Sequence, residues 1–118
     1  MAGIYKIGDD VVHSETFQRI DDNGDTVPIL LSSLEGYGIE IYIGNNLFGK
    51  WGNNLTGFTD DYYEATGTSE VTWNIPGSEF TKAGDYFGVL SLTYTDASFP
   101  DGLRDLSSKN KVLIFRIN

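Results

Sequence analysis

The residues of this chain that could do chemistry are mostly carboxylates, and an acid-rich turn is the first candidate. Asp21, Asn23 and Asp25 place oxygen ligands at alternate positions, as the start of a calcium-binding loop does. The pattern then departs from such a loop, because Gly24 stands at the fourth place instead of the sixth. Ser32 stands at the twelfth place, where a bidentate Glu is needed. The sequence therefore favours a solvated hairpin turn, and we predict no metal or cofactor.

A second candidate is the run His13-Ser14-Glu15, which contains residue types found in hydrolase triads. Neighbouring side chains on a strand point to opposite faces, so this order cannot form the proton relay. Glycosidases use two carboxylates, but in a chain with 17 acidic residues some carboxylate pairs lie close together by chance. We therefore predict no enzymatic activity and no catalytic residue. His13 is expected to be an exposed strand or loop residue.

Aromatic side chains offer a third kind of chemistry, which is stacking on sugar rings. The candidates for a stacking platform are Tyr42, Trp51, Phe58, Tyr62, Tyr63 and Trp73. Trp73 shares an apolar face with Val71 and Ile75, which predicts a core position. Trp51 follows a predicted hairpin and stands beside Gly52, so it could be exposed. A carbohydrate-binding β-sandwich module, with a surface glycan as its ligand, is therefore the alternative function.

The best candidate for binding another protein is Asp96–Ser108, which the sequence predicts to be a long polar loop. This segment carries two apolar residues, Phe99 and Leu103, and one cation, Arg104. Two interpretations are open: these side chains contact a partner, or the apolar pair folds back over the open end of the fold. Together with Trp51, these residues form the predicted protein interface.

Composition limits the classes of fold and partner. A chain of 118 residues predicts a single domain that spans 1–118. Cysteine is absent and histidine occurs once, which excludes disulfides, thiolate sites and sites with several histidines. The formal net charge is −9, and an acidic surface repels phosphate backbones and anionic lipids. We therefore expect neither nucleic acid nor a membrane as a partner. The charge serves either solubility or docking on a basic neighbour.

The elements that must position these residues are strands, and the clearest ones lie within 68–94. Thr68–Ile75 alternates between apolar and polar residues, and a second alternating run covers Tyr86–Tyr94. The sequence Gly84-Asp85-Tyr86 before the second run predicts a tyrosine corner, with a buried ring and a hydroxyl bonded to backbone upstream. This layout predicts an immunoglobulin-like fold.

Alternation and turn residues predict the remaining strands. They are expected at Ile4–Ile7, Glu15–Ile20, Tyr37–Ile43, Leu47–Trp51, Gly57–Tyr63 and Lys111–Ile117. Phe17 is the expected core residue of the second of these strands. Pro28–Leu34 is expected to be a crossing segment, because proline cannot donate to a strand ladder. Lys111–Ile117 is apolar on both faces, as in a central strand. The predicted fold is an all-β, immunoglobulin-like antiparallel β-sandwich of seven to nine strands.

This layout resembles the small immunoglobulin-like domains of tailed-bacteriophage structural proteins. The most similar are the N-terminal domains of baseplate upper proteins and the head-fibre or auxiliary capsid proteins of phages that infect Bacteroidetes. The segments that carry the resemblance are Asp21–Asp25, Pro28–Leu31, Ile39–Tyr42, Lys82–Tyr86 and Phe99–Arg104. The chain departs from the baseplate proteins in stopping after one predicted domain, which favours a compact adaptor or decoration subunit.

The resemblance implies a non-enzymatic structural protein of the virion, made in the cytoplasm of the bacterial host. Such a protein docks on capsid or tail and mediates the attachment of fibres or neighbouring subunits. Its partners would be other virion proteins, namely capsid, tail or fibre subunits. An edge strand or the segment Asp96–Ser108 would add to a neighbour, and many weak copies would sum by avidity.

Overall fold

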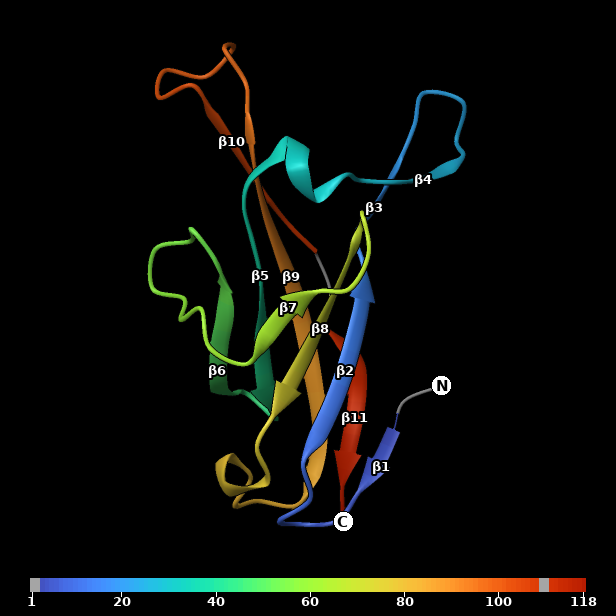
Figure 1. Ribbon diagram of the computed structural model, residues 1–118, viewed down its shortest axis with the longest axis vertical. Helices are drawn as coiled ribbons and strands as arrows, with labels where there is room; N and C mark the ends of the chain where they lie inside the picture. The colour runs from blue at the N-terminus through green and yellow to red at the C-terminus, as the bar shows by residue number, and fades with distance from the viewer. Residues whose placement is uncertain (1–2, 109–110) are drawn as a thin grey trace.

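The computed structural model describes residues 3–108 and 111–118, which form strands joined by turns (Figure 1). The larger sheet has six strands, and its order is β1-β11-β9-β5-β6 with β10 also paired to β9. These strands are β1 (Gly3–Tyr5), β5 (Leu34–Ile43), β6 (Asn46–Asn53), β9 (Gly84–Thr95), β10 (Leu103–Ser107) and β11 (Val112–Ile117). One edge of β9 pairs with β5. Its other edge pairs with β11 over its first half and with β10 over its second half.

The smaller sheet has three strands in the order β2-β8-β7 and lies in front of the larger one in Figure 1. Its strands are β2 (Val11–Thr16), β7 (Tyr63–Ala65) and β8 (Glu70–Ile75). Beyond β2 the chain forms a separate hairpin of β3 (Gln18–Ile20) and β4 (Thr26–Pro28). Short 3-10 turns occur at Leu31–Ser33 and Gly77–Glu79. The architecture is therefore an all-β one of two facing layers.

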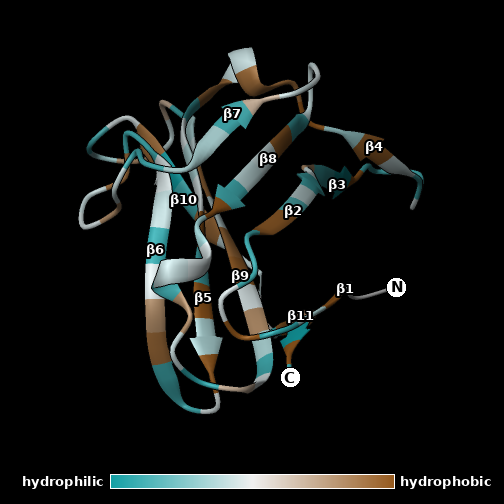
Figure 2. Cartoon of the chain, turned by 60° about the horizontal axis from the view of Figure 1, so that its bottom comes forward, coloured by the Kyte–Doolittle hydropathy of each residue, from teal (hydrophilic) through white to brown (hydrophobic). Residues whose placement is uncertain are grey.

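The core lies between the two sheets and follows from the alternation of the sequence. Val71, Trp73 and Ile75 of β8 are fully buried, and so is Ile41 of β5. Figure 2 shows hydrophobic bands separated by pale or hydrophilic ones along β5, as a strand with one buried face requires. Phe17, the predicted core residue between β2 and β3, is also fully buried.

One end of the sandwich is closed by aromatic rings, and we call it the corner end because it holds Tyr86. The Tyr86 hydroxyl donates a hydrogen bond to the Lys82 carbonyl at 2.7 Å, and the residue is 1% exposed. Its ring stacks on Phe115 and meets Phe80 edge-on, at centroid distances of 5.1 and 5.5 Å. The hydrogen bond and burial predicted for Tyr86 are therefore confirmed. Burial also raises the pKa of its hydroxyl.

Several predicted strand boundaries are wrong. Gly57–Tyr63 is not a single strand: Tyr63 begins β7 and pairs with Trp73, and before it Thr59 forms an isolated bridge with Trp51. Gly57 and Tyr62 have positive φ, which interrupts an extended chain. The predicted strand Glu15–Ile20 divides at Phe17 into β2 and β3. The described residues form eleven strands, more than predicted, and β1 pairs with β11 in parallel, so the sandwich is not wholly antiparallel.

The prediction of a long loop at Asp96–Ser108 is also wrong. Leu103–Ser107 forms β10, which pairs with the second half of β9 and turns the segment into a hairpin. A hydrogen bond from Asp96 N to Gly102 O at 2.8 Å closes the turn. Gly102 has a φ of 74°, a conformation that glycine adopts without steric cost. The turn itself is therefore short.

Candidate interaction site

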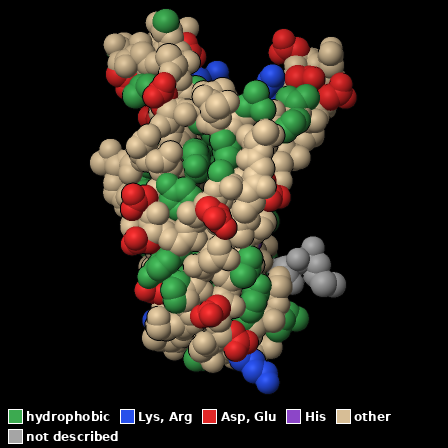
Figure 3. All heavy atoms as spheres, in the orientation of Figure 1, with side chains coloured by type: hydrophobic (Ala, Val, Ile, Leu, Met, Phe, Trp, Pro, Cys, Tyr) green, Lys and Arg blue, Asp and Glu red, His purple; other side chains and the backbone are tan. Residues whose placement is uncertain are grey.

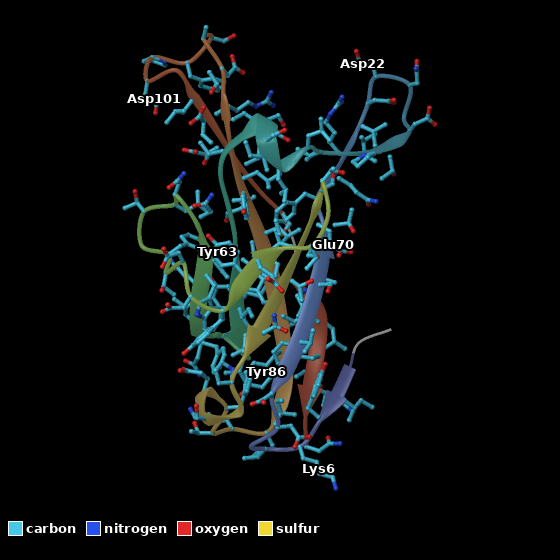
Figure 4. All side chains as sticks on the ribbon, in the orientation of Figure 1. Lys6, Asp22, Tyr63, Glu70, Tyr86 and Asp101 are labelled. Carbon is cyan, nitrogen blue, oxygen red and sulfur yellow. The ribbon has the colours of Figure 1, made fainter. Side chains whose placement is uncertain are left out.

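Two hairpins project from the end of the sandwich opposite the corner end, and we call this the hairpin end. One arm is the hairpin of β3 and β4, and the other is the hairpin of β9 and β10. Figure 4 shows Asp22 and Asp101 at the tips of the two arms, with Tyr86 towards the other end of the molecule. Each arm carries three aspartates and one arginine, so both tips are acidic.

Internal hydrogen bonds hold the tip of the β3–β4 arm. Asp21 Oδ1 accepts hydrogen bonds from the backbone N–H groups of Asn23 and Asp25, both at 2.9 Å. Gly24 has a φ of 83°, which suits a tight turn. The oxygen that would begin a calcium loop is thus engaged with the turn's own backbone, as expected for a hairpin.

Similar bonds hold the tip of the β9–β10 arm. Asp96 Oδ1 accepts a hydrogen bond from the Ser98 N–H at 2.9 Å, and Asp101 Oδ1 accepts one from the Leu103 N–H at 3.0 Å. The bonds from Ser98, with a smaller contribution from the positive charge of Arg104, lower the pKa of Asp96. Asp96 is therefore charged at neutral pH, and both arms present ordered, negatively charged tips.

An apolar groove lies between the arms, with a volume of about 220 Å³. We call it the hairpin groove, and its apolar lining is Phe17, Ile29, Leu90, Leu92, Tyr94 and Leu106. Phe17 and Ile29 are buried, whereas Leu106 is 41% exposed. Figure 3 shows hydrophobic side chains in the hollow between the two arms and acidic ones on the arms. The groove is therefore an apolar surface that the described part of the chain leaves open to solvent.

The two sides of β10 have different roles. Arg104 is paired with Tyr94 and Leu106 with Leu92, so both side chains lie on the groove side of the hairpin. Leu103 and Asp105 lie on the opposite face, where Asp105 Oδ1 accepts a hydrogen bond from the Thr93 hydroxyl at 2.7 Å. The sequence-predicted residues Leu103 and Arg104 thus do not share one surface.

The predicted interface residues are distributed over three places. Phe99 lies in the tip of the β9–β10 arm and is 43% exposed, Leu103 is 37% exposed and Arg104 is exposed. Trp51 is only 5% exposed, because its ring packs against Phe48 and Tyr62 at centroid distances of 5.6 and 6.1 Å. The exposed position considered for Trp51 is therefore wrong, and this residue is not available to a partner.

Sequence reasoning missed the residues that line the groove. The sequence predicts Leu106 to be part of a loop, but Leu106 stands opposite Leu92 in the pairing of β10 with β9. The run Leu103-Arg104-Asp105-Leu106 lacks the alternation of apolar and polar residues that indicates a half-buried strand, so no local pattern marks Leu106 as a groove residue. Ile29 comes from the predicted crossing segment and reaches the groove only in the folded chain.

The proposed sugar platform is not formed around Trp51. Trp51 and Trp73 are buried, while the other four candidates are half-buried at different places. The Tyr62 hydroxyl donates to Glu79 Oε1 at 2.9 Å, and this bond is the main reason that the pKa of Tyr62 is raised. The exposed aromatic surface centred on Trp51, which the carbohydrate-binding alternative needs, is therefore missing.

His13 is not the exposed residue that the sequence predicted. It lies on the inward side of β2, its side chain is 12% exposed, and its ring stacks on Trp73. His13 Nε2 is 3.1 Å from Glu15 Oε2 and has no hydrogen-bond partner. The Ser14 hydroxyl instead bonds to the Thr72 hydroxyl at 2.8 Å on the other face. As predicted, these neighbours do not form a relay.

A second cleft lies at the side of the sandwich, between β2 and β11, and has a volume of about 550 Å³. His13 and Glu15 lie at its polar part, and Ile39 and Ile114 form part of its apolar wall. A third depression, of about 430 Å³, lies on the outer face beside β10 and includes Leu103. The hairpin groove differs from both in having residues of both arms in its lining.

Two further features concern ions and membranes. Within residues 3–108 and 111–118, no group of three or more histidine, aspartate or glutamate side chains is arranged to hold a metal ion. In the same ranges, no helix has the length and apolar character needed to cross a membrane.

Comparison of this chain with protein-family models, with curated proteins and with solved structures finds no match.

Proposed function

We propose that this chain is a non-enzymatic attachment domain of a bacteriophage virion. In this role it is an adaptor or decoration protein that docks on capsid or tail and connects fibres or neighbouring subunits. The observation that carries the attachment part of the proposal is the hairpin groove, where Leu106 is 41% exposed between two projecting arms. An exposed apolar surface with a polar rim is typical of a protein-binding site.

The phage context of the proposal comes from the resemblance of the sequence layout to phage structural domains. A negatively charged subunit that binds through one end suits a repeated lattice, because many weak contacts add up. The location proposed for the protein is accordingly the virion, after synthesis in the host cytoplasm.

We further propose that the sandwich is immunoglobulin-like. In that fold, strands B, E and D lie in one sheet and strands C, F and G in the other, with a tyrosine corner near the start of strand F. The order β2-β8-β7 agrees with the first set, and the order β5-β9-β11 agrees with the second. Tyr86 near the start of β9 agrees with the corner.

Quantitative proteomics of gradient-purified particles from the native source tests the virion assignment. The proposal predicts that the chain sediments with capsid and tail proteins in a fixed stoichiometry. Its copy number would separate a capsid decoration, on the order of hundreds, from a tail adaptor, about six or twelve, since closed symmetry fixes such numbers. Absence from the particles would contradict the virion role and leave the fold unaffected.

A further inference from the structure

The tip of the β9–β10 arm carries an exposed apolar group between two acidic residues. Phe99 is 43% exposed, and Pro100 beside it is also exposed. Asp96 and Asp101 flank this pair in the sequence, and each bonds to the backbone of the turn through Oδ1. A carboxylate has about four acceptor sites, so both aspartates can accept further hydrogen bonds. The tip therefore presents an aromatic ring next to negative charge.

The hairpin groove carries the complementary groups. Leu106 belongs to its apolar lining, and Arg19 is the charged residue of that lining. Arg104 lies on the groove side of β10, because it stands opposite Tyr94, which is another lining residue. Figure 3 shows basic side chains on the inner sides of the two arms. Within residues 3–108 and 111–118, neither arginine forms an ion pair.

The size and charge of the groove indicate what it can bind. Its volume of about 220 Å³ lies below the roughly 300–1,000 Å³ of small-molecule pockets, so it suits one side chain of a larger partner. Arginine pairs with carboxylates through two parallel hydrogen bonds. A matching partner therefore presents an apolar side chain with carboxylates beside it. The tip of the β9–β10 arm has this chemistry.

The acidic character of the whole molecule opposes contact between two copies, but this opposition acts mainly at long range. The formal net charge is −9, and exposed charges are screened beyond about 8 Å at physiological ionic strength. A contact between arginine and carboxylate acts at hydrogen-bond distance, where screening is small. Asp105 lies on the opposite face of β10, where it accepts a hydrogen bond from Thr93. The charges nearest to an inserted tip are therefore the two arginines.

We propose that the tip of the β9–β10 arm of one copy of this chain inserts into the hairpin groove of a second copy. Phe99 enters the apolar part of the groove, and the carboxylates beside it pair with Arg19 and Arg104 of the other copy. Each contact uses the tip of one copy and the groove of the other. The inference rests on the proposed function as an attachment domain, because it names a neighbouring copy as the partner of the same site.

Sedimentation equilibrium of the purified chain tests the proposal. The contact is small, so the measurement extends to about 1 mM protein, where a dissociation constant of that order is still detected. We expect association that increases with concentration. Phe99→Ala and Leu106→Glu should each weaken it at least about tenfold, because one removes the inserted ring and the other puts a negative charge where the acidic tip enters. Leu47→Glu, at a similarly exposed leucine (48%) on β6, should leave association unchanged.

Mixing the two variants separates the tip from the groove. Phe99→Ala keeps an intact groove, and Leu106→Glu keeps an intact tip. The mixture should therefore form a one-to-one complex, although each variant alone stays monomeric. Circular dichroism should show each variant folded.

A second pair of variants tests the arginines. Arg19→Gln combined with Arg104→Gln should weaken association at least about tenfold, since the tip loses both of its cationic partners. The control with the same change of charge is Lys6→Gln combined with Lys82→Gln, at two exposed lysines outside the arms. This control should associate as the original chain does.

A chain that stays monomeric up to about 1 mM would overturn the proposal. Association that Phe99→Ala or Leu106→Glu leaves unchanged would also overturn it, and so would a mixture of the two variants that stays monomeric. A labelled peptide with phenylalanine between aspartates covers the other occupant. If that peptide binds a monomeric chain and Leu106→Glu abolishes the binding, the groove holds a segment of a different protein and the second copy is ruled out.

These results differ from failure of the virion role. If the chain is present in particles but is monomeric in solution, the attachment function stands and the contact between copies falls. If the chain associates through tip and groove but is absent from particles, the contact stands and the virion role falls.

Discussion

The two ends of this sandwich differ in how far their apolar side chains are exposed to solvent. At the corner end, Phe80, Tyr86 and Phe115 are at most 2% exposed and pack ring against ring. At the hairpin end, Phe99 in the tip of the β9–β10 arm and Leu106 in the groove are more than 40% exposed. Under the proposed function, stability depends on the corner end and binding on the hairpin end, so a substitution at one end should leave the property of the other end unchanged.

The largest expected effect on stability is at the corner end. Phe80→Ala removes a ring that packs on Phe48, Tyr86 and Phe115, and should cost about 3–5 kcal/mol of unfolding free energy. The matched control is Phe99→Ala at the hairpin end, which should change stability by no more than about 0.5 kcal/mol. Urea unfolding of both variants measures the contrast. Equal losses would show that the arm is part of the core.

A smaller effect is expected from the tyrosine corner. Tyr86→Phe keeps the ring in place but removes the hydrogen bond to the Lys82 carbonyl. The expected cost is roughly 1 kcal/mol, because a net hydrogen bond contributes about that amount. Urea unfolding measures this cost. A variant as stable as the original chain would show that this hydrogen bond does not stabilise the fold.

The corner end should also respond to acid. Arg116 donates two hydrogen bonds to the Asp85 carboxylate, and these lower the pKa of Asp85. A lowered folded-state pKa gives stability that is present above the unfolded pKa, about 4, and is lost as pH falls through the folded value. Asp85→Asn should therefore lower Tm at neutral pH and should match the original chain in strong acid.

The control for this ion pair is Arg116→Gln, which should remove the same pH-dependent part of Tm. The double variant should then lose little more than either single variant, since both changes break one interaction. Both residues are partly exposed, so added salt should reduce the effect. Thermal melts across the acid range measure all three variants, and fully additive losses would mean that the pair is not coupled.

The smallest effect on stability is expected from the arm of β9 and β10. Phe99→Ala combined with Arg104→Ala should leave Tm within a few degrees, since both residues are exposed. The same double variant should fail to be incorporated into particles, if the hairpin end is the docking surface. Immunoblots of purified particles measure incorporation, and normal incorporation would remove these two residues from the proposed interface.

Local alternation was sufficient to predict the strands that build the core. Val71, Trp73 and Ile75 define β8, and Ile39 and Ile41 define the buried face of β5. Each of these faces is determined within a single run of the sequence, because side chains on a strand repeat with a period of two. The Tyr86 corner was equally local, since its acceptor, the Lys82 carbonyl, lies four residues upstream.

The groove could not be predicted in the same way, because its residues are brought together only by the tertiary fold. Phe17, Ile29, Leu92 and Leu106 come from four separate segments of the chain. The burial of Trp51 could not be predicted for the same reason. Its ring packs against Tyr62, which has a positive φ and lies in a loop without a regular pattern of apolar residues. Long-range packing therefore decides both where the open surface lies and which tryptophan is hidden.

The central claim is that the hairpin end binds and the corner end does not. The most direct test supplies Leu106→Glu, Leu47→Glu and the original chain together during particle assembly and measures their ratio in purified particles by mass spectrometry. Leu47 is the second residue of β6, directly after the turn from β5, and is similarly exposed. Figure 1 shows that this turn lies at the end of β6 away from the arms. The account predicts that Leu106→Glu is excluded and Leu47→Glu enters as well as the original chain. Equal entry of all three, or exclusion of Leu47→Glu alone, would contradict it.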